Sequence, residues 1–200
     1  HLAMAFGQRG VTKGTRVAVL MRNCHRYVEV FLGLSKLGAV MVPLNWRLQA
    51  SELLYVLRDS DSRLLIHAGD FDETIGMLRA QLDSQVSILN LAEIELKAGV
   101  DGPKSSGVPA NVGGDDIAVQ MYTAAFGGRP RGAQVTHGGY MAEAAAVCMA
   151  LSIAEGGSTL VTVPLFHTYG LELSIATLAR GGRCVFVEPF DAQRALRNIE

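Results

Sequence analysis

The chain alternates short apolar runs with helix-length amphipathic segments, and this alternation constrains its fold more than any other feature. Residues 16–21 form a compact apolar run, after which Tyr27, Phe31 and Leu34 recur at the spacing of one helix face. Gly38 follows, and glycine readily adopts the left-handed conformation that ends many helices. Because parallel strands need a crossover connection, the alternation predicts parallel βαβ units in an α/β fold.

The same pattern continues to the last residues. It predicts strands at 16–21, 40–43, 64–67, 86–89, 118–122, 159–163 and 184–187, and helices at 3–6, 27–37, 51–59, 71–81, 140–151, 171–179 and 192–199. Since such crossovers are right-handed, helices should cover both faces of a sheet. We expect two helix-flanked sheets.

A stretch rich in glycine and proline interrupts the pattern at 98–114. Such a composition does not sustain a regular element, so a long loop or a join between subdomains is expected there. We predict a first α/β subdomain at 1–97, a connection at 98–114 and a second α/β subdomain at 115–200.

The composition limits the classes of function. With 18 Lys and Arg against 19 Asp and Glu, the formal net charge of −1 argues against a strongly basic nucleic-acid binder. Hydrophobic residues make up 49% of the chain, which is enough for a sizeable core, but no apolar run is long enough for a transmembrane segment. The cysteines, Cys24, Cys148 and Cys184, are scattered, which favours reduced thiols and a cytoplasmic location.

The most informative segment is 122–132, which reads Tyr-Thr-Ala-Ala-Phe-Gly-Gly-Arg-Pro-Arg-Gly. It follows a predicted strand and precedes a predicted helix. Glycines let backbone N–H groups gather round an anion, and Arg129 and Arg131 add positive charge, so the segment suits a polyphosphate. Its spacing is neither that of a P-loop nor that of a dinucleotide fingerprint. A solvated turn whose arginines face water is the alternative interpretation.

The segment resembles the phosphate-binding signature of the adenylate-forming superfamily, which includes acyl-CoA synthetases, luciferases and nonribosomal adenylation domains. The shared positions are Tyr122, Thr123, Gly128, Pro130 and Gly132, with Thr136-His137 downstream. The flanks also resemble the family in order and spacing: Arg16-Val17-Ala18-Val19, then Asn23, then Val42-Pro43-Leu44-Asn45, and later Pro164-Leu165-Phe166-His167 with Gly170. The overall match is most similar to fatty-acyl or aryl-CoA ligases.

The resemblance implies part of the large N-terminal lobe of an ATP-dependent carboxylate-CoA ligase, with ATP/AMP, Mg²⁺ and CoA as cofactors. It implies that the pyrophosphate end of the nucleotide is enclosed by Thr123, Gly127, Gly128, Arg129, Arg131 and Gly132. His167 would line the site of a fatty or aryl carboxylic acid. The family's later motifs and its small C-terminal lobe are not in this sequence, so these residues alone are not expected to complete the reaction. A homo-oligomer is left open.

Several departures from the signature support a second hypothesis. Ala124, Ala125 and Phe126 replace Ser, Gly and Thr, Gly127 replaces a second Thr, and Arg131 stands where the family has Lys. Lost hydroxyls remove hydrogen bonds to phosphate, each worth about 1.5–3 kcal/mol when charge-assisted. The alternative is therefore a non-catalytic relative that binds an acyl or nucleotide ligand or a partner protein.

Other chemistries find less support. A dinucleotide-dependent oxidoreductase would need a glycine fingerprint with an acidic residue about 20 positions later, which is missing. His25, His67 and His137 have no ligand-like spacing, so no metal site is predicted. No G-x-S-x-G elbow accompanies Ser152 or Ser174, which disfavours a hydrolase.

Overall fold

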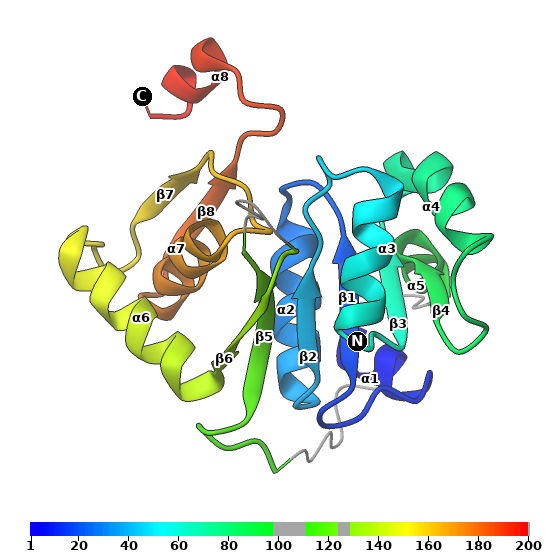
Figure 1. Ribbon diagram of the computed structural model, residues 1–200. Coiled ribbons are helices and arrows are strands. Elements are labelled where there is room, and N and C mark those ends of the chain that lie inside the picture. The colour runs from blue at the N-terminus through cyan, green and yellow to red at the C-terminus, as the bar shows by residue number, and fades with distance from the viewer. Residues whose placement is uncertain (98–110, 124–128, 200) are drawn as a thin grey trace.

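The computed structural model describes residues 1–97, 111–123 and 129–199 (Figure 1). The helices are α1 Leu2–Gly7, α2 His25–Lys36, α3 Ala50–Asp59, α4 Asp72–Arg79, α5 Leu91–Lys97, α6 His137–Ala150, α7 Thr168–Ala179 and α8 Ala192–Arg197, with a short 3-10 turn at Gly69–Phe71. The strands are β1 Arg16–Leu20, β2 Val40–Pro43, β3 Leu64–His67, β4 Ser87–Asn90, β5 Ile117–Tyr122, β6 Gly132–Thr136, β7 Ser158–Val161 and β8 Arg183–Phe186.

The strands form two sheets, and the predicted α/β fold is confirmed. Six strands lie in the order β4-β3-β1-β2-β5-β6, and β7 pairs with β8 in a second sheet. All pairs are parallel except β5 with β6. In Figure 1 the smaller sheet stands beside the β6 edge of the larger one, with α6 and α7 packed near it.

The division between the sheets does not follow the glycine- and proline-rich stretch. β5 lies beyond 98–114 in the chain, yet Val119 of β5 pairs with Met41 of β2. The two sheets instead separate between β6 and β7. Residues 98–110 of the predicted connection lie outside the described residues. A break in local sequence pattern carries no information about which sheet the next strand joins.

Strand β6 was not predicted, because 132–136 was expected to belong to a glycine-rich turn. It is an edge strand, antiparallel to β5, and Ala133 and Gln134 are exposed. Exposed edge strands lack the apolar run by which buried strands are recognised. Helix α5 was missed as well, since it follows β4 without a break.

Helix α6 begins three residues earlier than the predicted start at 140. The hydroxyl Oγ1 of Thr136 accepts the backbone N–H of Gly139 at 3.1 Å and so caps the helix. This side-chain acceptor satisfies one of the free N–H groups of the first turn, and it offsets the low helix propensity of Gly138 and Gly139.

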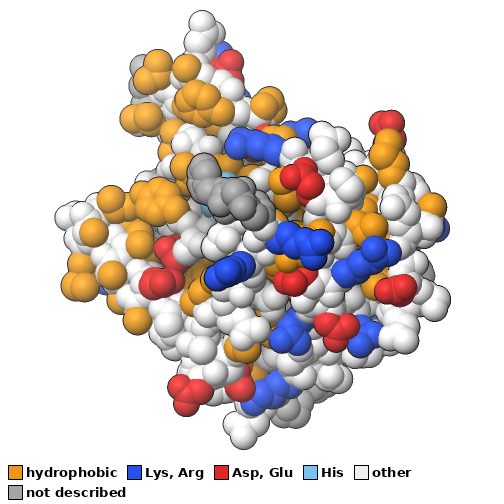
Figure 2. Space-filling view, in the orientation of Figure 1, with side chains coloured by type: hydrophobic (Ala, Val, Ile, Leu, Met, Phe, Trp, Pro, Cys, Tyr) orange, Lys and Arg blue, Asp and Glu red, His pale blue; other side chains and the backbone are white. Residues whose placement is uncertain are grey.

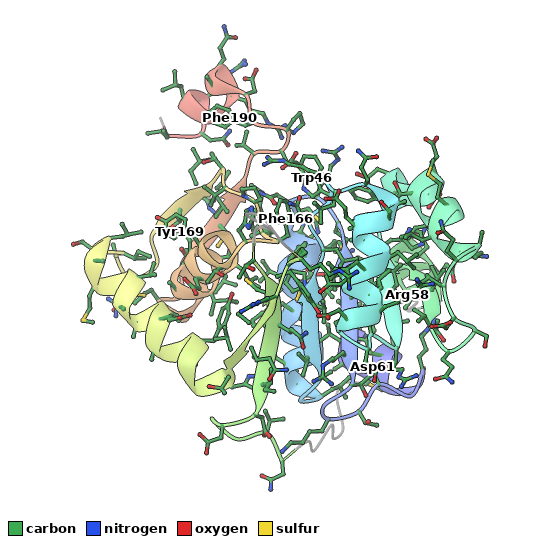
Figure 3. The ribbon with its side chains drawn as sticks, viewed as in Figure 1. Trp46, Arg58, Asp61, Phe166, Tyr169 and Phe190 are labelled. Atoms are coloured by element: carbon green, nitrogen blue, oxygen red, sulfur yellow. The ribbon has the colours of Figure 1, made fainter. Side chains whose placement is uncertain are left out.

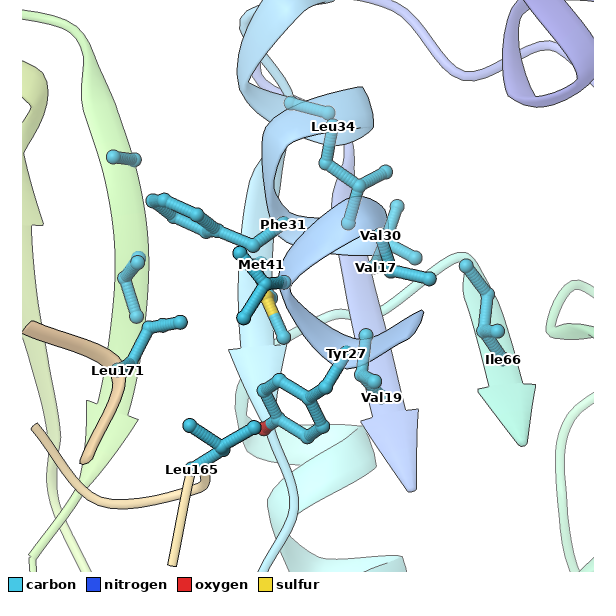
Figure 4. Packing of buried hydrophobic residues seen from close by; sticks show 14 of the residues in the cluster. Val17, Val19, Tyr27, Val30, Phe31, Leu34, Met41, Ile66, Leu165 and Leu171 are labelled. Carbon is cyan, nitrogen blue, oxygen red and sulfur yellow. The ribbon is translucent and has the colours of Figure 1, made fainter. Parts of the chain in front are cut away.

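The core lies on both faces of the larger sheet. On β1, Val17 and Val19 pack in one apolar cluster with α2, while Ala18 and Leu20 pack in another with α3 and α4. Alternate residues of a strand point to opposite faces, so a continuous apolar run such as β1 must be covered twice. Figure 4 shows the α2 cluster, in which Leu165 of the β7–α7 connection joins the first sheet's residues.

Apolar side chains are also exposed outside these clusters. Figure 2 shows them on the α6 and α8 regions, where Met149 is 76% exposed and Phe190 is 64% exposed. Among the described residues, no helix has the length and apolar character required to cross a membrane.

Candidate functional site

The candidate site lies where the parallel strands reach their carboxyl ends, the edge at which open α/β sheets bind ligands. β5 ends at Tyr122 and leads into Thr123, and β2 leads to Trp46 and Arg47. In Figure 3, Trp46 and Phe166 lie close together at this edge, whereas Asp61 lies toward the other end of the sheet.

The two stems of the signature segment are hydrogen-bonded to each other. The backbone N–H of Thr123 donates to the carbonyl of Arg131 at 3.0 Å, and the N–H of Arg131 lies 3.3 Å from Thr123 Oγ1. The predicted site residues Thr123 and Arg131 are therefore brought together, and both are exposed. Gly127 and Gly128 lie outside the described residues.

Gly132 has a packing role that the sequence did not reveal. It faces Tyr122 across the β5–β6 pair, and a β-carbon at this position would come 2.5 Å from Nε2 of Gln120. A side chain at position 132 would therefore displace the Gln120 side chain, which glycine leaves in place. A contact between Gly132 and a ligand stays a prediction.

Helix α3 holds both stems from the side. The Tyr122 hydroxyl donates to Asp59 Oδ2 at 2.7 Å, and the Tyr55 hydroxyl donates to the carbonyl of Pro130 at 3.1 Å. Burial and the neighbouring Asp59 carboxylate raise the pKa of Tyr122, so its hydroxyl keeps its proton in the physiological range. Sequence reasoning missed this arrangement. The available signal was that Tyr55 and Asp59 are four residues apart and so share one helix face.

The two arginines of the segment differ in their surroundings. The guanidinium of Arg129 lies 5.6 Å from the centre of the Tyr55 ring, a cation–π contact. The exposed Arg131 side chain has no ion pair or hydrogen bond among the described residues. As far as the described residues show, Arg131 is therefore the arginine of the segment whose side chain has no other contact to give up.

A second group of side chains combines arginines with aromatic rings. The ring of Trp46 lies edge-on to Phe166 at 6.1 Å, with Arg22 4.3 Å and Arg47 4.9 Å from the centre of the Trp46 ring. His167 follows, its ring 4.4 Å from that of Phe166. The group brings together the ends of β1, β2 and β7, which are far apart in the sequence.

His167 is the N-cap residue of α7, and its side chain is exposed at this edge. Partial burial, followed by repulsion from the Arg47 guanidinium, lowers the pKa of His167. Both effects favour the neutral form of the imidazole. Its neighbour Thr168 donates its hydroxyl to Met121 Sδ at 2.9 Å, which ties the start of α7 to β5.

A buried asparagine fixes the segment that leads to His167. Asn23, which is 5% exposed, donates its amide to the carbonyl of Val163 at 2.7 Å and accepts the backbone N–H of Leu165 at 2.8 Å. Its side chain replaces the backbone partners that this segment lacks. The end of β1 thereby sets the position of the segment after β7.

Within the described ranges, no three His, Cys, Asp or Glu side chains lie together in a way that could hold a metal ion. The arrangement offers instead a cation and hydrogen-bond donors on the loop stems, and an aromatic surface nearby. The cation and the donors on the loop stems suit phosphate oxygens, and the aromatic surface suits an apolar or aromatic group of a ligand.

Curated relatives match all or nearly all of the chain. It is 36% identical over 201 residues to a feruloyl-CoA synthase of Amycolatopsis sp, spanning 100% of this chain and 39% of that protein. It is 33% identical over 191 residues to the long-chain-fatty-acid–CoA ligase FadD13 of Mycobacterium tuberculosis, spanning 92% of this chain and 37% of the ligase. The chain thus spans about two fifths of the length of these relatives.

Solved structures of related enzymes have the same fold as this chain. The inhibitor-bound N-terminal domain of FACL13 from Mycobacterium tuberculosis superposes with a TM-score of 0.91 at 30% identity, covering 99% of this chain and 50% of that one. O-succinylbenzoate coenzyme A synthetase (MenE) from Bacillus subtilis, in complex with AMP, gives 0.85 at 26% identity, covering 99% of this chain and 49% of that one. The family model described as AMP-binding enzyme matches residues 1–200, so the resemblance to the adenylate-forming superfamily is confirmed: the chain, which is similar to acyl-CoA ligases, belongs to the family of AMP-binding enzymes.

Proposed function

We propose that the complete protein is an ATP-dependent ligase that joins a carboxylic acid to CoA through an acyl-adenylate. The observation that carries the proposal is the exposed Arg131 side chain on a stem that hydrogen bonds hold in place. Family membership adds support, as do the complexes of MenE with AMP and with ATP and magnesium.

In the first step the substrate carboxylate attacks the α-phosphorus of ATP. A carboxylate O–P bond forms, the bond to the bridging oxygen of the β-phosphate breaks, and pyrophosphate leaves. Charge gathers on the phosphate oxygens in the transition state, so a positioned cation such as Arg131 would lower the barrier. Thr123 and the glycines of the segment would supply hydrogen bonds to the same oxygens.

In the second step the CoA thiol attacks the acyl carbon, a thioester forms and AMP leaves. The residues proposed to line the acyl site are His167 and its aromatic neighbour Phe166. A neutral His167 beside an aromatic ring suits a fatty or aryl group more than a second charge. The relatives are named for ferulate, long-chain fatty acid and 2-succinylbenzoate, which are all carboxylic acids.

Magnesium would enter with the nucleotide. In nucleotide sites Mg²⁺ keeps several waters and is held largely by phosphate oxygens, with one or two carboxylates. The exposed stems, which present two arginines and one hydroxyl, fit a nucleotide that brings its own metal.

The test is pyrophosphate release by the complete protein with ATP, magnesium and a panel of ferulate, long-chain fatty acids and 2-succinylbenzoate. We expect release with at least one acid, and thioester formation only when CoA is added. Calorimetric titration of ATP into the same protein distinguishes the ligase from the alternative, a non-catalytic relative. A relative that has lost the nucleotide site would give neither heat of binding nor pyrophosphate.

A further inference from the structure

Helix α3 reaches both stems of the signature segment through two side chains, Tyr55 and Asp59. Asp59 contacts the first stem through the Tyr122 hydroxyl, and Tyr55 contacts the second stem at the Pro130 carbonyl. These four residues, here termed the α3 clamp, join parts of the chain that lie 63 and 75 positions apart.

The protons of the α3 clamp can be counted. The Tyr122 hydroxyl accepts the Gln120 amide at 3.1 Å and so directs its own proton to Asp59. The Tyr55 hydroxyl has one proton and two acceptors within reach, the Pro130 carbonyl at 3.1 Å and Asp59 Oδ1 at 3.3 Å. One proton cannot serve both acceptors, so the Tyr55 hydroxyl that donates to Pro130 leaves Asp59 as the acceptor of the Tyr122 hydroxyl.

The α3 clamp also distinguishes the two arginines. Tyr55 presents its ring face to Arg129 and its hydroxyl to the residue after Arg129. Arg129 therefore contributes to anchoring the second stem, and Arg131, two residues on, keeps its side chain exposed. Loss of the clamp should move the backbone that carries Arg131.

We propose that Asp59 is a positioning residue of the nucleotide site, acting through Tyr122 on the first stem while Tyr55 anchors the second. It touches no phosphate itself; it holds Thr123 and Arg131 in the geometry in which they can meet one. This inference rests on the proposed function only for the binding of ATP. The anchoring of the two stems by the α3 clamp does not depend on any ligand.

The first measurement needs no ligand. In Asp59→Ala, hydrogen exchange of the Thr123 and Arg131 amides should speed up by about 5- to 30-fold, the range expected when one or two net hydrogen bonds are lost. Asp59→Asn keeps an oxygen acceptor for Tyr122 and should stay within about 3-fold of the wild type. Asp61→Asn is the matched control, because Asp61 is an exposed carboxylate just beyond the same helix and pairs with Arg63 at 3.0 Å.

The second measurement uses ATP and the complete protein. Asp59→Ala should raise the KM for ATP by about 5- to 30-fold with a smaller change in kcat, and Tyr55→Phe should raise it less, because the ring under Arg129 remains. Asp61→Asn should leave both constants unchanged. An Asp59→Asn variant as impaired as Asp59→Ala would contradict the acceptor argument.

The outcomes separate this inference from the proposed function. Unchanged amide exchange in Asp59→Ala, or an equal increase in Asp61→Asn, overturns the positioning role even if the wild type binds ATP. Faster exchange confined to Asp59→Ala, in a wild type that binds no ATP, upholds the anchoring of the stems and refutes the nucleotide site.

Discussion

Gly170 packs directly against the backbone carbonyl of Pro164, so closely that a β-carbon at position 170 would overlap the carbonyl oxygen. The same carbonyl accepts the backbone N–H of His167 at 3.2 Å. The Pro164 carbonyl oxygen therefore closes a tight turn by a hydrogen bond and also packs against the first turn of α7. This arrangement presents His167 at the carboxyl edge of the sheets. Any side chain at position 170 would push the turn away from α7.

The first prediction concerns this contact. Gly170→Ala should lower the free energy of unfolding by about 1–3 kcal/mol, because the backbone oxygen cannot move aside as a flexible side chain could. Gly76→Ala is the matched control: Gly76 lies in α4 with no atom within 4 Å of the added carbon, and alanine should stabilise that helix by about 0.5–1 kcal/mol. Denaturant unfolding measures the change in the free energy of unfolding for both variants. Changes of the same sign in the two variants would contradict the packing argument.

The second prediction concerns the loop arginines. Arg131→Ala should weaken the use of ATP by roughly 2–4 kcal/mol in transition-state terms, because a charge-assisted contact to phosphate is lost. Arg129→Ala should have a smaller effect, since its guanidinium already lies against Tyr55. Calorimetric titration of ATP into the wild type and both variants tests the order. Equal affinities in all three would discard the role of the arginines but not the fold.

The third prediction concerns the charge of His167. Arg47→Met should raise the pKa of His167 toward its ordinary value of 6.5, since the repulsion from the guanidinium disappears while partial burial remains. An NMR titration of the imidazole measures the shift, with the exposed Arg79→Met as a control that should leave it unchanged. In the wild type the unfolded chain binds this proton more readily, so His167 lowers stability as the pH falls below about 6.5.

The fourth prediction concerns Glu172, a carboxyl group that is 7% exposed in α7 and whose Oε1 has no hydrogen-bond partner among the described residues. Burial and the nearby Glu143 raise the pKa of Glu172 to about 7 from 4.5. The folded state then binds the proton more tightly, so stability should fall as the pH rises from about 4.5 to above 7.

Glu172→Gln should flatten that pH dependence and raise the free energy of unfolding at pH 8 by about 1–3 kcal/mol, because no charge has to be buried. Denaturant unfolding between pH 5 and pH 8 measures the free energy of unfolding of the wild type and the variant at each pH. Glu143→Gln should give an intermediate effect, since it removes the like charge and leaves the burial. A wild type whose stability does not change over this range would refute the assignment.

The local sequence pattern was enough to predict the buried strands. β2 and β3 coincide with the predicted runs at 40–43 and 64–67, because a strand buried on both faces is largely apolar and is recognisable by itself. Where the structure is exposed, as in β6, the same signal is absent and the prediction missed the strand. The start of α6 likewise depended on one capping hydroxyl, that of Thr136, rather than on the apolar pattern.

The sequence by itself determined the α/β class, the family and the segment that carries Thr123, Arg129 and Arg131, because these depend on residues adjacent in the chain. The tertiary structure alone decided that Asp59 meets Tyr122 and that Asn23 holds the segment before His167. Those contacts exist because β5 pairs with β2 beneath α3, and because the end of β7 approaches the end of β1. Sheet order is set by the summed burial of whole faces, so no short stretch of sequence contains it.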